Sequence, residues 1–176
     1  MCGIVGLFLK DKSLEPRLGS MLSEMLISLS DRGPDSAGIA IYGAPSGNEA
    51  KITIQSAKPE HDFRNIDAEL ARAIGTPVNI AVKSTHAVVR TTPDKIDEVR
   101  EAIQVLRPDI RIMGAGDVVE IYKEVGLPEA VVDRFDVRSM TGTHGIGHTR
   151  MATESAVTTM GAHPFSTGAD RCLVHN

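Results

Sequence analysis

Between residues 18 and 29 the chain carries the pattern that most restricts its fold. Apolar side chains recur there with the spacing i, i+3, i+4, i+7, i+8 and i+11, at Leu18, Met21, Leu22, Met25, Leu26 and Leu29. Because an α-helix turns once every 3.6 residues, this spacing places them all on one face. Pro16 suits the first turn, and Gly33 lies beyond the end. The pattern predicts an amphipathic helix whose Met and Leu stripe belongs to the core and is not a cofactor site.

Strands and further helices are predicted on both sides of this helix. A buried strand is expected at 3–9, and a strand at 36–43 is expected to pair with 51–57 as a hairpin. Helices are predicted at 62–74, 93–108 and 117–126, and strands at 78–90, 110–113, 142–153 and 170–176. Residues 75–136 therefore form a strand–helix–strand–helix module, which we interpret as an inserted α/β subdomain.

The composition excludes several classes of function. With 19 basic and 23 acidic residues, the formal net charge is −4, and only 3% of the residues are aromatic. A protein that binds nucleic acid needs a basic surface or aromatic stacking faces, and this chain offers neither. No apolar run is long enough to span a membrane, and the apolar start lacks the features of a signal peptide. Two cysteines do not make a disulfide framework, so a cytoplasmic setting is expected.

The cysteine at position 2 has two interpretations. Taken alone, Cys2 is best explained as a small buried residue at the start of the first strand. If Met1 is removed, however, one residue carries both a thiol and a free α-amine. An α-amino group has a pKa of about 7.7–8.0, close to the value of roughly 8.5 for a cysteine thiol. The amine can then serve as the base for its own nucleophile.

Three further segments place polar side chains at turns or strand ends. "RGPDSAG" carries Arg32 and Asp35 in a turn, "GHTRMAT" carries Arg150, and "VHN" ends in Asn176. The planar guanidinium of an arginine binds a carboxylate through two parallel hydrogen bonds. The side-chain amide of an asparagine can donate to a developing oxyanion.

Together with "MCGIVG" and the downstream "AHP", these segments resemble the class II glutamine amidotransferases, in the order in which that family has them. The resemblance covers residues 1–43 and 141–176. It implies an α+β fold, the four-layer αββα sandwich of antiparallel sheets found in N-terminal-nucleophile hydrolases. The implied domain spans 2–176, is incomplete at the C-terminus, and contains the 75–136 insertion. The implied activity is hydrolysis of glutamine to glutamate and ammonia, which a synthase domain or partner then consumes.

The resemblance also assigns roles at the reacting end of the substrate. Cys2 matches the nucleophile that forms a thioester, and its α-amine matches the base. Arg150 matches the residue that binds the substrate α-carboxylate. Asn176 matches the asparagine of the oxyanion hole, but the glycine that follows it in the family, and a downstream aspartate for the substrate amine, lie beyond the last residue.

Other residues are matched to the walls of the glutamine pocket. Thr153 and His163 line that pocket in some members of the family, and Arg32 and Asp35 belong to a turn that shapes its wall. Met151 stands where many relatives carry an aromatic or another apolar residue, which changes the shape of the pocket. The most similar branch is related to glutamate synthase, in particular the amidotransferase subunit of N-methylglutamate synthase. A hetero-oligomer is therefore expected, with flavin or iron–sulfur centres in partner subunits and no cofactor in this chain.

Alternative interpretations are less well supported. His144 and His148 have an i, i+4 spacing, but their glycine-rich setting predicts a strand, so no metal site is expected. The segment "IMGAGDVVEI" lacks the full glycine pattern of a dinucleotide-binding loop. Cys172 is expected to be an inert core thiol. Two other functions stay open: a non-catalytic scaffold or regulatory subunit that retains the fold, and a different N-terminal cysteine hydrolase that cleaves a linear amide.

Overall fold

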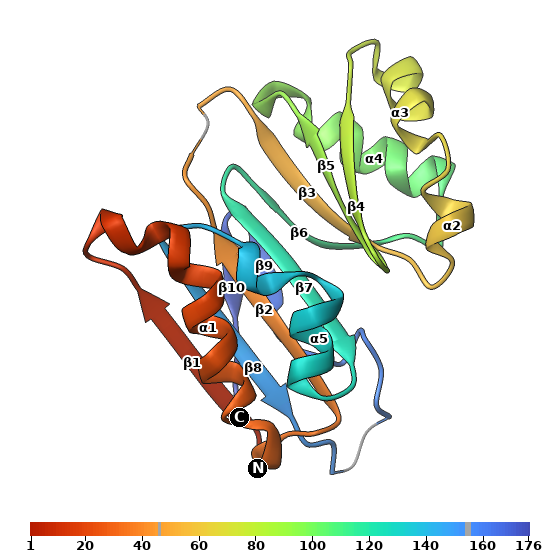
Figure 1. Ribbon diagram of the computed structural model, residues 1–176. Helices are drawn as coiled ribbons and strands as arrows, with labels where there is room; N and C mark the ends of the chain where they lie inside the picture. The colour runs from red at the N-terminus through yellow and green to blue at the C-terminus, as the bar shows by residue number, and fades with distance from the viewer. Residues whose placement is uncertain (46, 154–155) are drawn as a thin grey trace.

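The computed structural model describes residues 1–45, 47–153 and 156–176, which form two four-stranded antiparallel sheets and a two-stranded ribbon (Figure 1). The first sheet has the order β1-β8-β2-β7, with bounds Gly3–Phe8, His144–Arg150, Ser36–Tyr42 and Val119–Val125. The second has the order β4-β5-β3-β6, with bounds Asn79–Lys83, His86–Thr91, Ala50–Gln55 and Arg111–Gly116. The ribbon pairs β9 with β10, with bounds Phe165–Gly168 and Arg171–Leu173.

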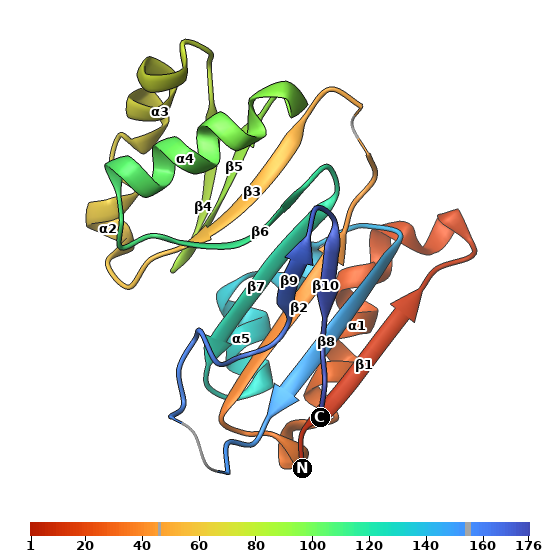
Figure 2. The same cartoon turned by 180° about the vertical axis from the view of Figure 1, so that it is seen from behind.

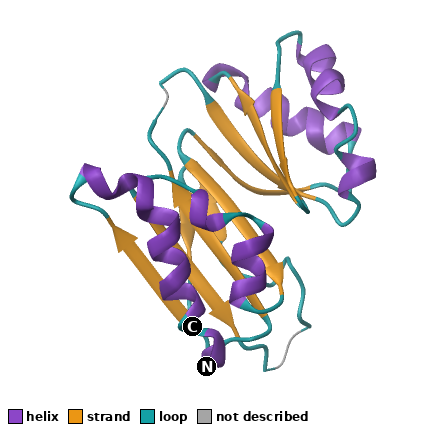
Figure 3. Cartoon of the chain, viewed as in Figure 1, coloured by secondary structure: helices purple, strands orange, loops and turns teal. Residues whose placement is uncertain are grey.

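Helices accompany each sheet separately (Figure 3). The first sheet is covered on one face by α1 and α5, with bounds Leu18–Ile27 and Pro128–Arg134. Beside the second sheet lie α2, α3 and α4, with bounds Pro59–Asp62, Ile66–Ile74 and Ile96–Leu106. Short 3₁₀ turns, η1 to η4, complete the described elements, with bounds Lys12–Arg17, Ser30–Arg32, Pro93–Lys95 and Val137–Ser139.

The amphipathic helix predicted between residues 18 and 29 is confirmed as α1. Leu18, Leu22 and Leu26 are fully buried against the first sheet, and the methionines of the stripe pack at its margin. Pro16 lies in η1, directly before α1, where its missing N–H costs no hydrogen bond of the helix. The stripe therefore forms core, as its spacing predicts.

Strand β2 is buried along its whole length because both faces of the first sheet are covered. Ala37, Ile39 and Ile41 pack into the core under α1. The alternate residues Ala40 and Tyr42 belong to a second cluster on the opposite face, next to Cys172. Figure 2 shows the β9–β10 ribbon lying across this opposite face. Cys172 is half-buried and its Sγ lies 2.9 Å from the hydroxyl of Tyr42.

The second sheet has an almost purely aliphatic core. Ile52 and Ile54 of β3 and Val89 of β5 pack against Leu70 of α3 and Ile103 of α4. The amphipathic spacing of the 93–108 segment predicts α4, and the structure confirms it as Ile96–Leu106. The helix predicted at 62–74 is present from Ile66 onward.

Residues 117–126, predicted as a helix, form strand β7, so that prediction is wrong. In β7, Val119 and Ile121 face one cluster and Tyr122 faces the other, which is the alternation of a strand. Lys123 and Glu124 carry charges that suggest an exposed position, but tertiary partners bury both residues.

The predicted strands also need three corrections. Residues 36–43 and 51–57 do not pair, because β2 lies between β7 and β8 while β3 lies between β5 and β6. Residues 78–90 are two strands, since the chain reverses at Ser84, which has a left-handed φ of 55°. Strand β9 lies between the strands predicted at 142–153 and 170–176, where the sequence indicates no strand.

The fold is α+β with antiparallel sheets, and this arrangement is compatible with the sandwich implied by the sequence. The strands of the 75–136 module are divided between the sheets: β4, β5 and β6 lie in the second and β7 in the first. Within the described residues, no helix has the length and apolar character needed to cross a membrane.

Candidate functional site

The register of the first sheet brings three distant segments together at one edge of the sheet, where β1 and β2 begin and β8 ends. Gly3 at the start of β1 pairs with Thr149 near the end of β8. Ser36 at the start of β2 pairs with Arg150 at the end of the same strand. Cys2 and Asp35, which precede β1 and β2, therefore lie beside Arg150. Figures 1 and 2 both place the two chain termini at this edge.

The alternation of strand residues also places the key side chains on one face. Val5 of β1 packs under α1, so Cys2 and Ile4 belong to the opposite face. A Cβ on Gly147 would lie 2.8 Å from a methyl group of Val5, so Gly147 also faces α1. Its neighbour His148, and Arg150 two residues further on, therefore share the face of Cys2. This is the face over which the β9–β10 ribbon lies.

Cys2 is half-buried, and its Sγ lies 3.9 Å from the carbonyl oxygen of Met151. The ammonium group of Met1 lies 3.3 Å from the Sδ of the same Met151. Arg150 is half-buried, and its Nη1 donates to the carbonyl of Ala156 at 3.4 Å. The nucleophile and the cation predicted from the sequence are thus at adjacent strand ends.

The "RGPD" turn supports the backbone at Arg150. A Cβ on Gly33 would lie 2.4 Å from the carbonyl carbon of Thr149, so only glycine permits this close approach. The backbone N–H of Asp35 donates to the carbonyl of Arg150 at 3.1 Å, and Oδ2 of Asp35 accepts from the N–H of Ala152 at 2.7 Å. Asp35 therefore fixes the chain after Arg150. Arg32 is exposed in η2.

His163 lies at the centre of a histidine cluster on the same face. Its ring centre is 4.2 Å from that of His148 and 4.5 Å from that of His175. His163 is 6% exposed, and neither ring nitrogen has a partner among the described residues. Burial, and the neighbouring histidines and cations, lower its pKa to about 4, so the ring is neutral at pH 7. It offers one donor and one acceptor to a bound molecule.

The C-terminal segment is attached to β8 through His148. Nε2 of His148 lies 3.0 Å from the carbonyl oxygen of His175. The next residue, Asn176, is exposed, as is Thr153 in the loop after β8. The structure thus brings Cys2, Asp35, Arg150, His163 and the segment that carries Asn176 to one region, with Arg32 and Thr153 exposed at its margin.

Lys123 is a contributor that the sequence analysis missed. Its side chain is 3% exposed, and Nζ donates to the carbonyls of Ala162 and Pro164 at 2.8 and 3.2 Å. Nζ also lies 4.6 Å from the ring centre of Phe165. Burial lowers the pKa of this ammonium group to about 8. Lys123 therefore holds the segment that carries His163 against β7, and only the alternation within residues 119–125 could have indicated its buried position.

No metal-binding group is found in the part of the chain that the structure describes. Clusters of three or more His, Cys, Asp or Glu side chains placed to hold an ion do not occur there. His144 and His148 lie on one face of β8, but they are four positions apart along the strand, a distance of about 13 Å. The ring of His144 instead stacks on Tyr42, with ring centres 4.1 Å apart.

Comparison with known proteins gives two informative similarities. The chain is 69% identical over 176 residues to the glutamine amidotransferase-like protein GlxB of Rhizobium meliloti (strain 1021), and covers 58% of it. It is 34% identical over 186 aligned positions to a protein provisionally named a glutamine amidotransferase in Methanothermobacter thermautotrophicus (strain Delta H), and covers 61% of it. The chain thus spans about three fifths of the length of these relatives. No family model matches it. Both of these relatives are named for glutamine amidotransfer.

Proposed function

We propose that this chain carries the glutamine-hydrolysing site of an amidotransferase, with Cys2 as its nucleophile. The observation that carries the proposal is that Cys2, Arg150 and the C-terminal segment meet at one edge and on one face of the first sheet. The similarity to two proteins named for glutamine amidotransfer supports glutamine as the substrate.

Removal of Met1 would place the α-amine on Cys2 itself. The amine then takes the thiol proton, and the sulfur attacks the side-chain amide carbon of glutamine, forming a C–S bond. When the tetrahedral intermediate collapses, the C–N bond breaks, and the amine delivers its proton to the departing ammonia. Water hydrolyses the resulting thioester, which releases glutamate and restores the thiol.

The remaining roles are divided between substrate binding and charge stabilisation. The guanidinium of Arg150 binds the α-carboxylate of glutamine through paired hydrogen bonds. The side-chain amide of Asn176 donates to the oxyanion, a contribution that is worth roughly 2.7–4 kcal/mol in such sites. Thr153 and the neutral ring of His163 line the pocket.

The finer parts of the assignment also belong to this proposal. They are a class II, N-terminal-nucleophile hydrolase sandwich and an ammonia-consuming synthase as partner, such as a glutamate or N-methylglutamate synthase. We expect a cytoplasmic hetero-oligomer in which any flavin or iron–sulfur centre belongs to the partner subunits. The 75–136 module is proposed as an insertion into the amidotransferase domain.

Covalent labelling tests the nucleophile directly. The complete natural protein is incubated with a diazo-ketone analogue of glutamine, and intact mass and peptide mapping are recorded with ammonia release from glutamine. We expect a mature chain that begins at Cys2 and takes one label on this residue. Cys2→Ala should abolish labelling and lower ammonia release at least about 10³-fold.

Cys172→Ala is the matched control, because this thiol, on strand β10 of the ribbon, lies against Tyr42. It should retain both labelling and turnover. Active protein that keeps Met1 would exclude the α-amine as the base. A complete protein that neither takes the label nor releases ammonia would instead support the non-catalytic scaffold.

A further inference from the structure

The hydrogen bond from His148 to the C-terminal segment is accepted by a backbone carbonyl next to Asn176. The carbonyl of His175, 3.0 Å from Nε2 of His148, belongs to the peptide bond that joins His175 to Asn176. Because a peptide unit is planar, holding this oxygen restricts where the backbone nitrogen and Cα of Asn176 can lie. One imidazole therefore acts directly on the peptide that carries the proposed oxyanion donor.

The chemistry of the pair determines which atom carries the proton. A carbonyl oxygen only accepts, so Nε2 of His148 must be the donor. Burial lowers the pKa of this fully buried side chain, so the neutral ring has its proton on Nε2 and a bare Nδ1. No described residue donates to Nδ1. Among the described residues, the ring's one hydrogen bond is therefore that to His175.

The surroundings of His148 hold its ring in place. Its backbone pairs with Ile4 of β1 and Gly38 of β2, so it sits on the central part of the sheet and not on a loop. The ring packs against His163, with centres 4.2 Å apart. Arg150 follows two residues later on the same face of β8. A single strand therefore carries both the proposed carboxylate-binding cation and the support for the C-terminal segment.

We propose that His148 is a positioning residue, which holds the His175–Asn176 peptide so that the Asn176 amide is aimed at the oxyanion. This inference rests on the proposed function and extends it, because it assigns His148 a role that acts through the peptide of Asn176. Donors to an oxyanion are effective only when they are held in place before the reaction. The effect of losing the support should therefore fall on kcat, while the KM for glutamine, which depends on Arg150, changes little.

The test uses two substitutions of similar length in the complete natural protein. His148→Gln carries an amide that can reach the position of Nε2 and donate to the carbonyl of His175. His148→Met has nearly the same shape but no donor. We expect His148→Met to lower kcat for ammonia release about 10–100-fold with KM changed less than about threefold. His148→Gln should recover most of the lost rate.

His144→Met is the matched control, because His144 lies on the same strand and face but stacks on Tyr42. It should keep kcat within about twofold. Thermal unfolding of all variants checks the fold. If His148→Met does not fold, His148→Asn replaces it, because its shorter amide reaches only the position of Nδ1 and should show the same loss.

Each result decides between the alternatives. Equal kcat in the Gln and Met variants, whether lowered or unchanged, overturns the positioning role while the unsubstituted protein remains an active glutaminase. A rise in KM without a change in kcat also overturns it. If the unsubstituted protein neither releases ammonia nor takes the label at Cys2, the proposed function itself fails, and the role of His148 fails with it.

Discussion

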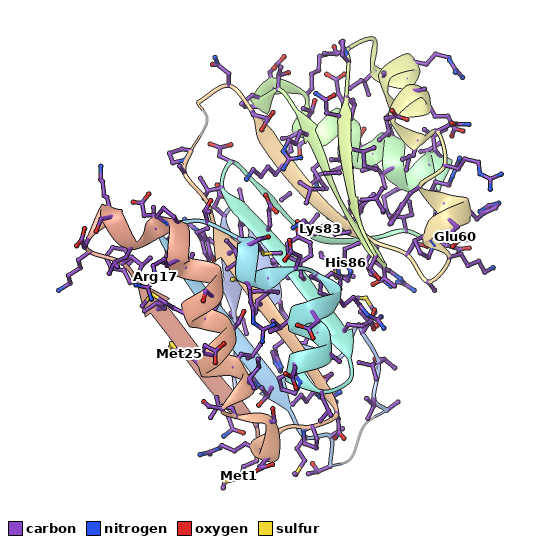
Figure 4. All side chains as sticks on the ribbon, viewed as in Figure 1. Met1, Arg17, Met25, Glu60, Lys83 and His86 are labelled. Atoms are coloured by element: carbon purple, nitrogen blue, oxygen red, sulfur yellow. The ribbon has the colours of Figure 1, made fainter. Side chains whose placement is uncertain are left out.

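The two sheets of this chain bury different kinds of side chain. Under α3 and α4, the second sheet buries an aliphatic cluster with Phe63 as its one aromatic member. On its ribbon face, the first sheet buries His148, His163 and the ammonium group of Lys123. In Figure 4, Met1 lies at the end of the first sheet away from the second, whereas Lys83 and His86 lie where the two sheets approach each other.

This difference gives the two sheets different roles: the second contributes mainly to stability, whereas the first also carries the candidate site. Aliphatic burial stabilises without directional demands, so the second sheet can tolerate small adjustments in packing. Buried polar groups need partners in fixed positions, so the first sheet depends on its contacts to Ala162, Pro164 and His175. We therefore expect substitutions in the second sheet to alter the free energy of unfolding, and substitutions in the first to alter activity as well.

The largest loss of stability is expected in the aliphatic core. Ile103→Ala removes a side chain on α4 that is 0% exposed and should lower the free energy of unfolding by about 2–5 kcal/mol. Val105→Ala on the same helix, at a side chain 80% exposed, should change it by less than about 0.5 kcal/mol. Urea unfolding measures both. The KM for glutamine should not change in either variant. A large shift in KM for Ile103→Ala would show that the second sheet also affects the candidate site.

A smaller loss of stability, now coupled to activity, is expected at Gly38 in β2. A Cβ there would lie 2.2 Å from the carbonyl oxygen of His163 and 2.5 Å from the Cβ of Lys123. Gly38→Ala must displace the segment that carries His163, at an expected cost of about 1–3 kcal/mol, and kcat/KM should fall with it. Gly43→Ala is the control, because its Cβ would meet nothing closer than 3.6 Å. Full activity in Gly38→Ala would show that the position of His163 is unimportant.

The smallest effect on stability is expected at His86. It should be absent at neutral pH and appear only at acidic pH. Burial lowers the pKa of His86 to about 4, whereas an unfolded histidine titrates near 6.5. The unfolded state therefore binds the proton first, and the stability present above pH 6.5 is lost as the pH falls towards 4. His86→Gln should lose less stability than the unsubstituted protein between pH 7 and pH 4.5, as measured by urea unfolding. Equal losses would mean that His86 does not contribute.

Local patterns were sufficient for α1 and α4 and insufficient for the sheet order. The periodicity of residues 18–29 and 93–108 predicts α1 and α4, because the burial of one helix face is recorded in the local spacing. The pairing of β2 with β7 and β8 is set by contacts between distant segments. The helix predicted at 117–126 failed for the same reason, since Lys123 is buried by carbonyls from a loop about 40 residues away.

The candidate site could be predicted only through the order of its motifs. Composition and spacing identify Cys2 and Arg150 as reactive residue types, but nothing local places them at adjacent strand ends. The register of β1 and β2 with β8 does so. The hydrogen bonds of Lys123 and His148 could not be predicted from the sequence alone, because they depend on which backbone carbonyls lie within reach.

The antiparallel order β1-β8-β2 also has a consequence for synthesis of the protein. Cys2 is translated long before the strand that carries Arg150, because most of the described chain lies between them. A nascent or prematurely terminated chain therefore exposes the thiol without the cation beside it and cannot hold glutamine next to it. Under the proposed function, ammonia is released only by chains whose translation has passed β8, so turnover reports completed folding of the first sheet.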